Sequence, residues 1–195
     1  MSSEIKANLI YEVTSANGVS IDGLNIKDSA INTGSIGSSV TGYTGIKAFQ
    51  QFRLTSAKGN ITTESDFTSN ISEVSGGLNS HVTQSSGIFS FSSTGIYWVM
   101  LNISVSYDNE SKYVLGWIKG ETGSGYSKIA RCVTIRFDVG SGDVESGAMC
   151  HTLFDVTDKD THKIKFSVEA EDSTTFVASS TENRTYFTFL RIGDT

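Results

Sequence analysis

The feature that most constrains the fold is a 13-residue stretch, GIYWVMLNISVSY at residues 95–107, whose side chains alternate with the period of a β-strand. One face is apolar along its whole length and carries Tyr97, Val99, Leu101, Ile103, Val105 and Tyr107. The other face starts apolar and ends polar, in the order Ile96, Trp98, Met100, Asn102, Ser104 and Ser106. The fully apolar face fits the interior of a β-sandwich.

The apolar end of the second face of residues 95–107 must be shielded from water. A monomer in water rarely exposes large apolar side chains in a row, so we expect Ile96, Trp98 and Met100 to be buried by something. A loop, the second sheet of the same subunit or another subunit would each provide that cover, and the residues alone leave these alternatives open.

Further strands surround this one. KIKFSVEA at residues 163–170 alternates apolar and polar side chains, residues 129–137 place Ile129, Val133, Ile135 and Phe137 on one face, and TYFTFLRIG near the end is rich in aromatic residues. Gly-rich turns separate the strands, and no segment has the pattern of an amphipathic helix. Residues 48–195 are therefore predicted to form an all-β sandwich or jelly-roll head.

Residues 1–47 have a different sequence pattern, with short apolar segments in place of long strands. Short apolar pairs alternate with Asn-Gly and Asp-Gly turn signals, and the apolar members are Val19, Ile21, Leu24, Ile26 and Ile31. Each piece is shorter than an ordinary strand of about five to six residues, so one copy cannot bury it. Residues 33–45, TGSIGSSVTGYTG, are nearly low-complexity and indicate a thin neck.

Three segments occur in an order that is also found in a known superfamily. FSFSSTGIYWVMLNISV carries Phe89, Phe91, Gly95 and Tyr97, SGAMCHTLFDVTDKDTHKIKFSVEA follows, and TYFTFLRIGDT comes last. Over about residues 48–193 this order resembles the complement and tumour-necrosis-factor superfamily. The resemblance implies a jelly roll that assembles as a compact homotrimer, in which Ile96, Trp98 and Met100 are interface candidates. Three copies of the N-terminal rungs wound around one axis would then bury their apolar residues together, which makes those five residues interface candidates too.

The N-terminal stretch TSANGVSIDGLNIKD resembles short segments of tailed-bacteriophage structural proteins. This resemblance implies a virion surface protein, made in the host cytoplasm, whose residues 1–47 are the anchor to a capsid or tail protein. The apolar residues Ile5, Leu9, Ile10 and Val13 are the anchor candidates. The expected function is a homotrimeric head fibre or capsid decoration protein. The alternatives are a tail-fibre tip that binds a host-surface glycan or protein, and a secreted bacterial lectin-like module.

The two cysteines, Cys132 and Cys150, are equidistant from Ser141 and would face each other across a hairpin centred there. A disulfide is then conceivable, but no secretion signal precedes the chain's β-rich part, so two buried thiols are the preferred interpretation. The superfamily resemblance places residues 129–137 and 148–156 on opposite sheets, which counts against the hairpin pairing.

Several function classes lack support in the sequence. The net charge of −6 and the absence of a basic cluster disfavour nucleic acid as a partner, and no apolar run approaches the roughly 18 residues of a membrane span. The histidines, His81, His151 and His162, have no nucleophile at motif spacing, so we expect no enzyme activity and no cofactor. The acidic turns around Asp143 and Asp158 match no known order of calcium ligands, so we expect no metal.

Overall fold

The computed structural model describes residues 19–21, 24–27, 30–31, 46, 48–107, 113–135 and 144–195. The chain divides into two compact units, Met1–Thr44 and Gly45–Thr195. From the sequence we placed the boundary at residue 47. That the head, residues 48–195, folds without the N-terminal segment stays a prediction. The anchor candidates Ile5, Leu9, Ile10 and Val13 lie outside the described residues.

In the N-terminal unit, three short strands pair antiparallel in the order β1 (Val19–Ile21), β2 (Leu24–Lys27) and β3 (Ala30–Ile31). Val19 lies opposite Ile26, Ile26 opposite Ile31, and Ile21 opposite Leu24. Residues directly opposite each other, and residues two apart in one strand, take positions on the same face of a sheet. The five apolar rung residues therefore share one face of a single chain's small sheet.

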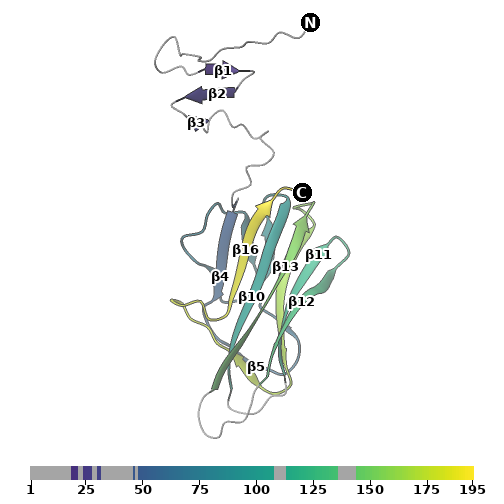
Figure 1. The fold of residues 1–195 in the computed structure, drawn as a ribbon. Coiled ribbons are helices and arrows are strands. Elements are labelled where there is room, and N and C mark those ends of the chain that lie inside the picture. The colour runs from purple at the N-terminus through teal and green to yellow at the C-terminus, as the bar shows by residue number, and fades with distance from the viewer. Residues whose placement is uncertain are drawn as a thin grey trace. The chain divides into compact units, whose positions relative to one another are not determined.

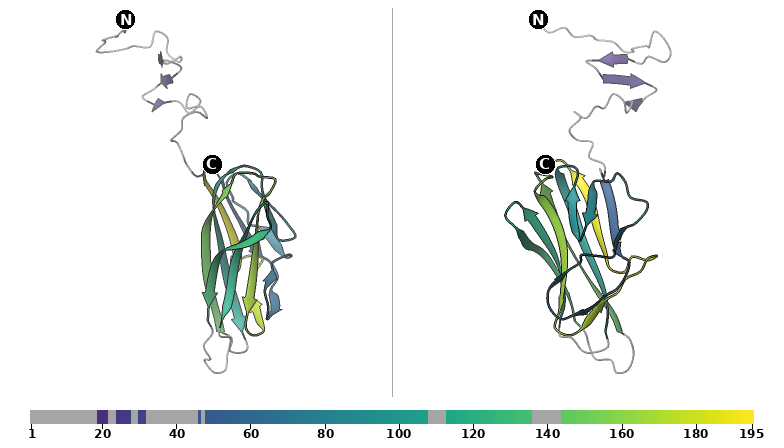
Figure 2. Two further views of the ribbon diagram at one scale, coloured as in Figure 1. Left: turned by 90° about the vertical axis from the view of Figure 1, so that its right-hand side faces the viewer. Right: turned by 180° about the vertical axis from the view of Figure 1, so that it is seen from behind.

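The second unit is a sandwich of two antiparallel sheets (Figures 1 and 2). Its strands are β4 (Ala48–Leu54), β5 (Lys58–Ile61), β6 (Ser65–Asp66), β7 (Ile71–Glu73), β8 (Val82–Ser85), β9 (Ile88–Phe91), β10 (Gly95–Tyr107), β11 (Val114–Thr122), β12 (Tyr126–Thr134), β13 (Val144–Val156), β14 (His162–Ala170), β15 (Thr174–Phe176) and β16 (Tyr186–Gly193). We call one layer the β10 sheet, with the order β5-β15-β10-β16-β4-β7 and β13 on the other side of β10. The other layer is the β14 sheet, with the order β12-β11-β14-β9-β8 and β6 beside β14. The all-β jelly-roll fold expected from the sequence is confirmed.

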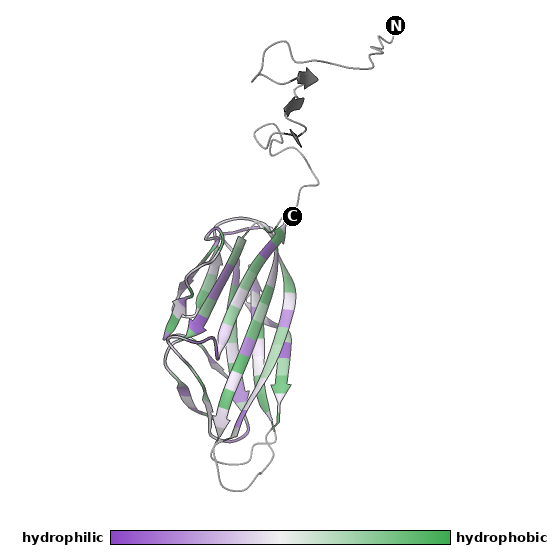
Figure 3. Ribbon diagram, turned by 60° about the vertical axis from the view of Figure 1, so that its left-hand side comes forward, coloured by the Kyte–Doolittle hydropathy of each residue, from purple (hydrophilic) through white to green (hydrophobic). Residues whose placement is uncertain are grey.

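The core lies between the two sheets, and Figure 3 shows the alternation of hydrophobic and hydrophilic residues along the strands that produces it. The apolar face of β10 points inward: Tyr97, Val99, Leu101, Ile103 and Val105 are at most 1% exposed. The inward face of β14 supplies Ile164, Phe166 and Val168. Phe89 joins the layers, with ring centroids 5.2 Å from Phe166 and 5.0 Å from Phe189. Burial of these side chains, at about 1.5–3 kcal/mol each, is the main force that holds the sheets together.

Strand β12 differs from the simple alternation. Its inward positions carry Ala130 and Cys132, whereas Ile129 within the strand, Val133 near its end and Ile135 just beyond it are 38%, 51% and 49% exposed. A register shift between Ile118 and Lys119 on the neighbouring strand accompanies this arrangement. The single apolar face predicted for residues 129–137 is therefore wrong: Val133 lies on the solvent side of an edge strand, whereas a methyl group of Ile129 lies 3.0 Å from the inward Cβ position of Gly120. Phe137 lies outside the described residues.

At the opposite edge of the sandwich, a buried amide joins the two sheets. The Gln50 side-chain oxygen on β4 accepts hydrogen bonds from the backbone N–H groups of His81 and Val82, both at 2.6 Å. Its side-chain nitrogen donates to the Val82 carbonyl at 3.0 Å and to the Glu73 carboxylate at 2.9 Å. All the polar atoms of this buried side chain are thereby satisfied, as burial requires.

Candidate functional site: the outer face of the β10 sheet

The outer face of the β10 sheet carries a row of large apolar side chains that crosses four strands. In the strand register, Leu153 on β13 lies opposite Trp98 on β10, Trp98 opposite Leu190 on β16, and Leu190 opposite Phe49 on β4. Directly opposite residues share a face and touch side by side. We call these four residues the apolar row.

The candidates Ile96, Trp98 and Met100 therefore lie on the outside of the sandwich and do not face its second sheet. That sequence alternative is wrong, because the inward face of β10 is the one that begins with Tyr97. Met100 is only 7% exposed, whereas Leu153 and Met149, on the neighbouring strand β13, are 61% and 55% exposed. Met100 is therefore already covered within the single chain, whereas Leu153 and Met149 beside the candidates remain in water.

His151 belongs to the same face. It lies opposite Met100 in the register, and its ring centroid is 5.5 Å from that of Trp98. Ile192 adds another apolar side chain, 39% exposed, close to the end of β16. The half of the face that begins at Ile96 is thus an extended apolar surface, of the kind that marks an interaction site on a soluble protein.

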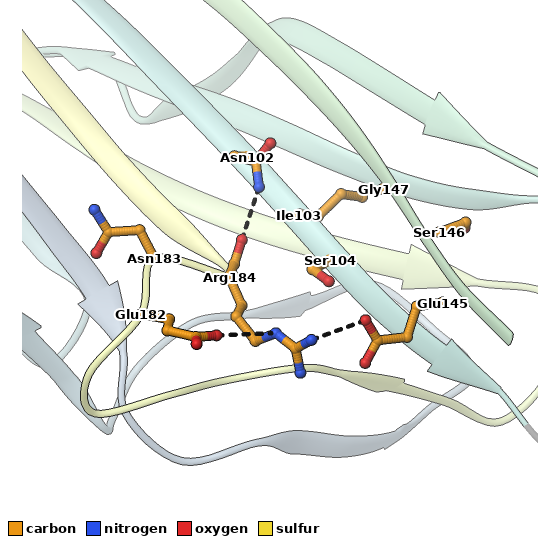
Figure 4. Close-up of a pocket in the computed structure, with 9 residues that line it drawn as sticks. All are labelled: Asn102, Ile103, Ser104, Glu145, Ser146, Gly147, Glu182, Asn183 and Arg184. Atoms are coloured by element: carbon orange, nitrogen blue, oxygen red, sulfur yellow. Dashed lines mark hydrogen bonds and ion pairs between the residues drawn. The ribbon is translucent and has the colours of Figure 1, made fainter. Parts of the chain in front are cut away.

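The other half of the same face is polar and hollowed (Figure 4). A recess of about 490 Å³ is lined by Asn102, Ile103, Ser104, Glu145, Ser146, Gly147, Glu182, Asn183 and Arg184. The Arg184 guanidinium forms ion pairs with Glu145 at 2.9 Å and Glu182 at 3.9 Å. The Asn102 side chain donates to the Arg184 carbonyl at 2.7 Å. The recess offers hydrogen-bonding groups but contains no cysteine, histidine or lysine that could start covalent chemistry.

A second apolar patch lies on another face of the sandwich, formed by Val133 on the edge strand β12 and Ile135 just beyond it. We call it the β12 patch. It belongs to the β14 sheet, whereas the apolar row belongs to the β10 sheet, so the two patches do not overlap. The chain therefore presents two different apolar surfaces to its surroundings.

The rest of the outer face of the β14 sheet is charged. Lys119 on β11 forms ion pairs with Glu64, at 3.1 Å, and with Asp66, while Lys128 reaches Glu64 at 2.7 Å and Lys165 reaches Asp66 at 3.5 Å. The hydrogen bond from Lys128, helped by Lys119 and Ser167 and opposed by partial burial, lowers the pKa of Glu64 to about 2. The Lys128 ammonium also lies 4.0 Å from the centre of the Trp117 ring.

No arrangement typical of catalysis is seen in the described part of the chain. His81 contacts Ser93 at 2.9 Å, and His162 is buried beside Thr157 at 3.3 Å. No group of three or more His, Cys, Asp or Glu residues that could hold a metal ion occurs among the described residues. In the same residues, no helix is long and apolar enough to cross a membrane.

The fold has known counterparts among solved structures. Murine APRIL at pH 8.5 matches with a TM-score of 0.56 at 10% sequence identity, over 74% of this chain and 98% of that one. The structure of Eiger TNF from S. frugiperda matches with a TM-score of 0.52 at 10% identity, over 77% of this chain and 96% of that one. No family model matches the sequence, and no curated protein matches it. The expected jelly-roll fold, like that of these tumour-necrosis-factor-type structures, is therefore confirmed.

Proposed function

We propose that this protein is a homotrimeric structural protein that displays a jelly-roll head on a larger particle, specifically a head fibre or capsid decoration protein of a tailed bacteriophage. The observation that carries the self-association is the apolar row, with Leu153 61% exposed beside Trp98. Burial of such a surface stabilises a complex by about 25 cal/mol per Å² of apolar area.

The positions of the two apolar patches favour a ring over a two-fold dimer. In an isologous dimer each copy would cover the same patch of its partner, and the β12 patch would stay in water. A heterologous contact, with the β12 patch of one copy against the apolar row of the next, covers both, and it forms a ring when the rotation between copies closes. The likeness in fold to the tumour-necrosis-factor superfamily favours three as that number.

The particle to which the trimer belongs is proposed from the N-terminal unit. Its segment TSANGVSIDGLNIKD resembles phage structural proteins, and its strands β1–β3 gather five apolar residues on one face of a sheet. Three such faces around one axis would cover one another, and Ile5, Leu9, Ile10 and Val13 would contact a capsid or tail protein. The virion surface is accordingly the proposed location.

A second candidate function is a tail-fibre tip that binds a host-surface glycan or protein, and the polar recess favours it. Side chains such as Asn102, Glu145 and Arg184 offer donors and acceptors that suit a hydroxyl-rich ligand. The two functions differ in where the protein is mounted on the particle. Localising the protein in an electron-microscopy map of intact virions distinguishes head from tail.

Sedimentation equilibrium of the full chain tests the assembly. We expect a mass three times that of the 21.0 kDa chain at micromolar concentration, and a monomer mass would refute the trimer. Deletion of residues 2–13 tests the mounting: the variant should remain a soluble trimer that no longer joins particles. If it still co-purifies with virions at normal copy number, the anchor lies elsewhere.

A further inference from the structure

The two cysteines meet at the open edge of the sandwich where β12 and β13 lie. In the register, Cys132 on β12 lies opposite Gly116, and Cys150 on β13 lies opposite Leu101. A Cβ placed on Gly116 would be 2.8 Å from the Cys132 sulfur and 2.9 Å from a Leu101 methyl group. Because Gly116 has no side chain, the Cys132 sulfur can lie beside it and close to Leu101 of the β10 sheet. Cys150 lies directly opposite Leu101 in that same sheet.

Both thiols are free and belong to the same buried cluster, and the hydrogen bond between Thr134 Oγ1 and Ser146 Oγ, at 3.1 Å, shows that β12 and β13 lie against each other near them. Cys132 is 6% exposed and Cys150 is 7% exposed. Cys132 also contacts the Gly116 carbonyl oxygen at 3.7 Å. The hydrogen bond from Cys150 holds the pKa of Cys132 below its usual range, whereas the same contact raises the pKa of Cys150. Cys132 is therefore the thiol that ionises first and acts as the nucleophile, since only a thiolate attacks.

We propose that Cys132 and Cys150 form an inter-sheet disulfide under oxidising conditions, which joins strand β12 of the β14 sheet to strand β13 of the β10 sheet. The oxidant is a low-molecular-weight disulfide such as oxidised glutathione. The Cys132 thiolate attacks one of its sulfur atoms and expels the first glutathione thiolate, which takes up a proton. Cys150 then loses its proton to solvent, attacks the Cys132 sulfur and expels the second glutathione thiolate. One oxidised glutathione becomes two reduced molecules, and the protein loses two electrons and two protons.

The site is suited to a structural bond because the cross-sheet hydrogen bond seen near it in the described residues is a single side-chain contact, between Thr134 Oγ1 on β12 and Ser146 Oγ on β13 at 3.1 Å. At the opposite edge the Gln50 side chain joins β4 to β8 by hydrogen bonds. Among the described residues, β12 pairs with β11, and β13 pairs with β10, so no ladder of hydrogen bonds joins β12 to β13. A disulfide here would restrict separation of the two sheets where side-chain packing and the Thr134–Ser146 hydrogen bond now oppose it.

The test uses the full chain, purified in reductant and then incubated in glutathione buffers of increasing oxidised fraction. We expect the intact mass to fall by two hydrogen atoms per chain, with both thiols lost to alkylation in denaturant and no link between chains. The midpoint of thermal unfolding should rise by roughly 5–15 °C, and dithiothreitol should reverse the change. Cys132→Ser and Cys150→Ser are matched controls that should show neither the mass loss nor the shift.

Two results would overturn the inference. One is that both thiols remain open to alkylation in denaturant after prolonged incubation, including after refolding in the oxidising buffer. The other is that oxidation yields stable glutathione adducts or links between chains in place of the internal bond. Either outcome would mean that the two sulfur atoms cannot reach bonding geometry within one folded chain.

Discussion

The chain has two tryptophans, and each lies near the middle of the outer face of one sheet, in opposite surroundings. Trp117 on the β14 sheet lies opposite Arg131 and Ser167, and the Lys128 ammonium lies over its ring. Trp98 on the β10 sheet lies opposite Leu153 and Leu190. Cations of the same chain cover Trp117 and remain hydrated themselves, whereas the neighbours of Trp98 extend the apolar surface. Trp117 is thus covered by cations of its own chain, whereas Trp98 lies in the apolar row that we propose is covered by assembly.

The largest effect should come from a charge placed in the apolar row. Trp98→Asp or Leu153→Asp should abolish the trimer, because a carboxylate desolvated at an interface costs several kcal/mol. Leu153 is exposed within one chain, so its variant should keep the circular dichroism and thermal unfolding of a folded monomer. Thr83→Asp, at an exposed position of β8 on the other sheet, is the matched control and should stay trimeric. Trimers of unchanged affinity in both row variants would remove this face from the interface.

The converse change, on the charged face, should affect folding and leave assembly intact. Lys119→Met removes the ammonium that pairs with Glu64 and Asp66 and leaves two carboxylates facing each other with less compensation. We expect a loss of about 1–3 kcal/mol in the free energy of unfolding, measured with urea, at unchanged sedimentation mass. Lys159→Met, which breaks only the exposed ion pair with Asp160, should cost much less. Dissociation of the Lys119→Met trimer would contradict the division between the faces.

The decrease in the free energy of unfolding at acid pH should depend in part on Glu64 of the charged face. The pKa of Glu64 is about 2 in the folded chain and 4.5 ordinarily. Because folding depresses it, this carboxylate stabilises the fold fully above about pH 4.5, and the contribution disappears as pH falls towards 2. Since the side chain is partly open to solvent, we expect about 1 kcal/mol or less. Urea unfolding of Glu64→Gln between pH 7 and pH 2 should show a flatter acid limb than the parent chain, and parallel curves would argue against the Lys128 contact.

The smallest expected effect is that of salt, which should weaken the ion pairs of the charged face and leave the apolar row unaffected. Raising sodium chloride from about 0.1 M to 1 M shortens the screening length from about 10 Å to about 3 Å. The difference in unfolding free energy between the parent chain and Lys119→Met should then shrink by about 0.5 kcal/mol. The trimer, held by apolar contacts, should not weaken in the same series. A trimer that dissociates at 1 M salt would indicate that ion pairs, and not the apolar row, hold it.

Much of the fold could be predicted because alternation decides which face of a long strand is buried. The core face of β10 and the inward residues Ile164, Phe166 and Val168 of β14 followed from period two alone. Strand β12 did not, because a register shift and an edge position free a strand from that rule. There the buried residue is Cys132, and the larger Val133 is outside.

Only part of the candidate site could be predicted from the sequence, and the reason is related. Ile96 and Trp98 stand out within one strand, but Phe49, Leu153 and Leu190 join them only through cross-strand register. Register depends on which distant strands pair, and no local pattern encodes that. The Gln50 contacts were equally beyond prediction, since a lone glutamine in a strand gives no sign of the backbone groups it will meet.

The position of β16 has a consequence for synthesis. It lies between β10 and β4 and provides the link through which those two strands belong to one sheet. A ribosome makes β4 long before β16, so the pairing of Leu190 with Phe49 must wait, and such non-local contacts form slowly. A chain truncated before residue 186 would hold β13 with β10 and β4 with β7 as separate fragments. It would have no continuous row from Phe49 to Leu153, so incomplete chains would be excluded from the trimer.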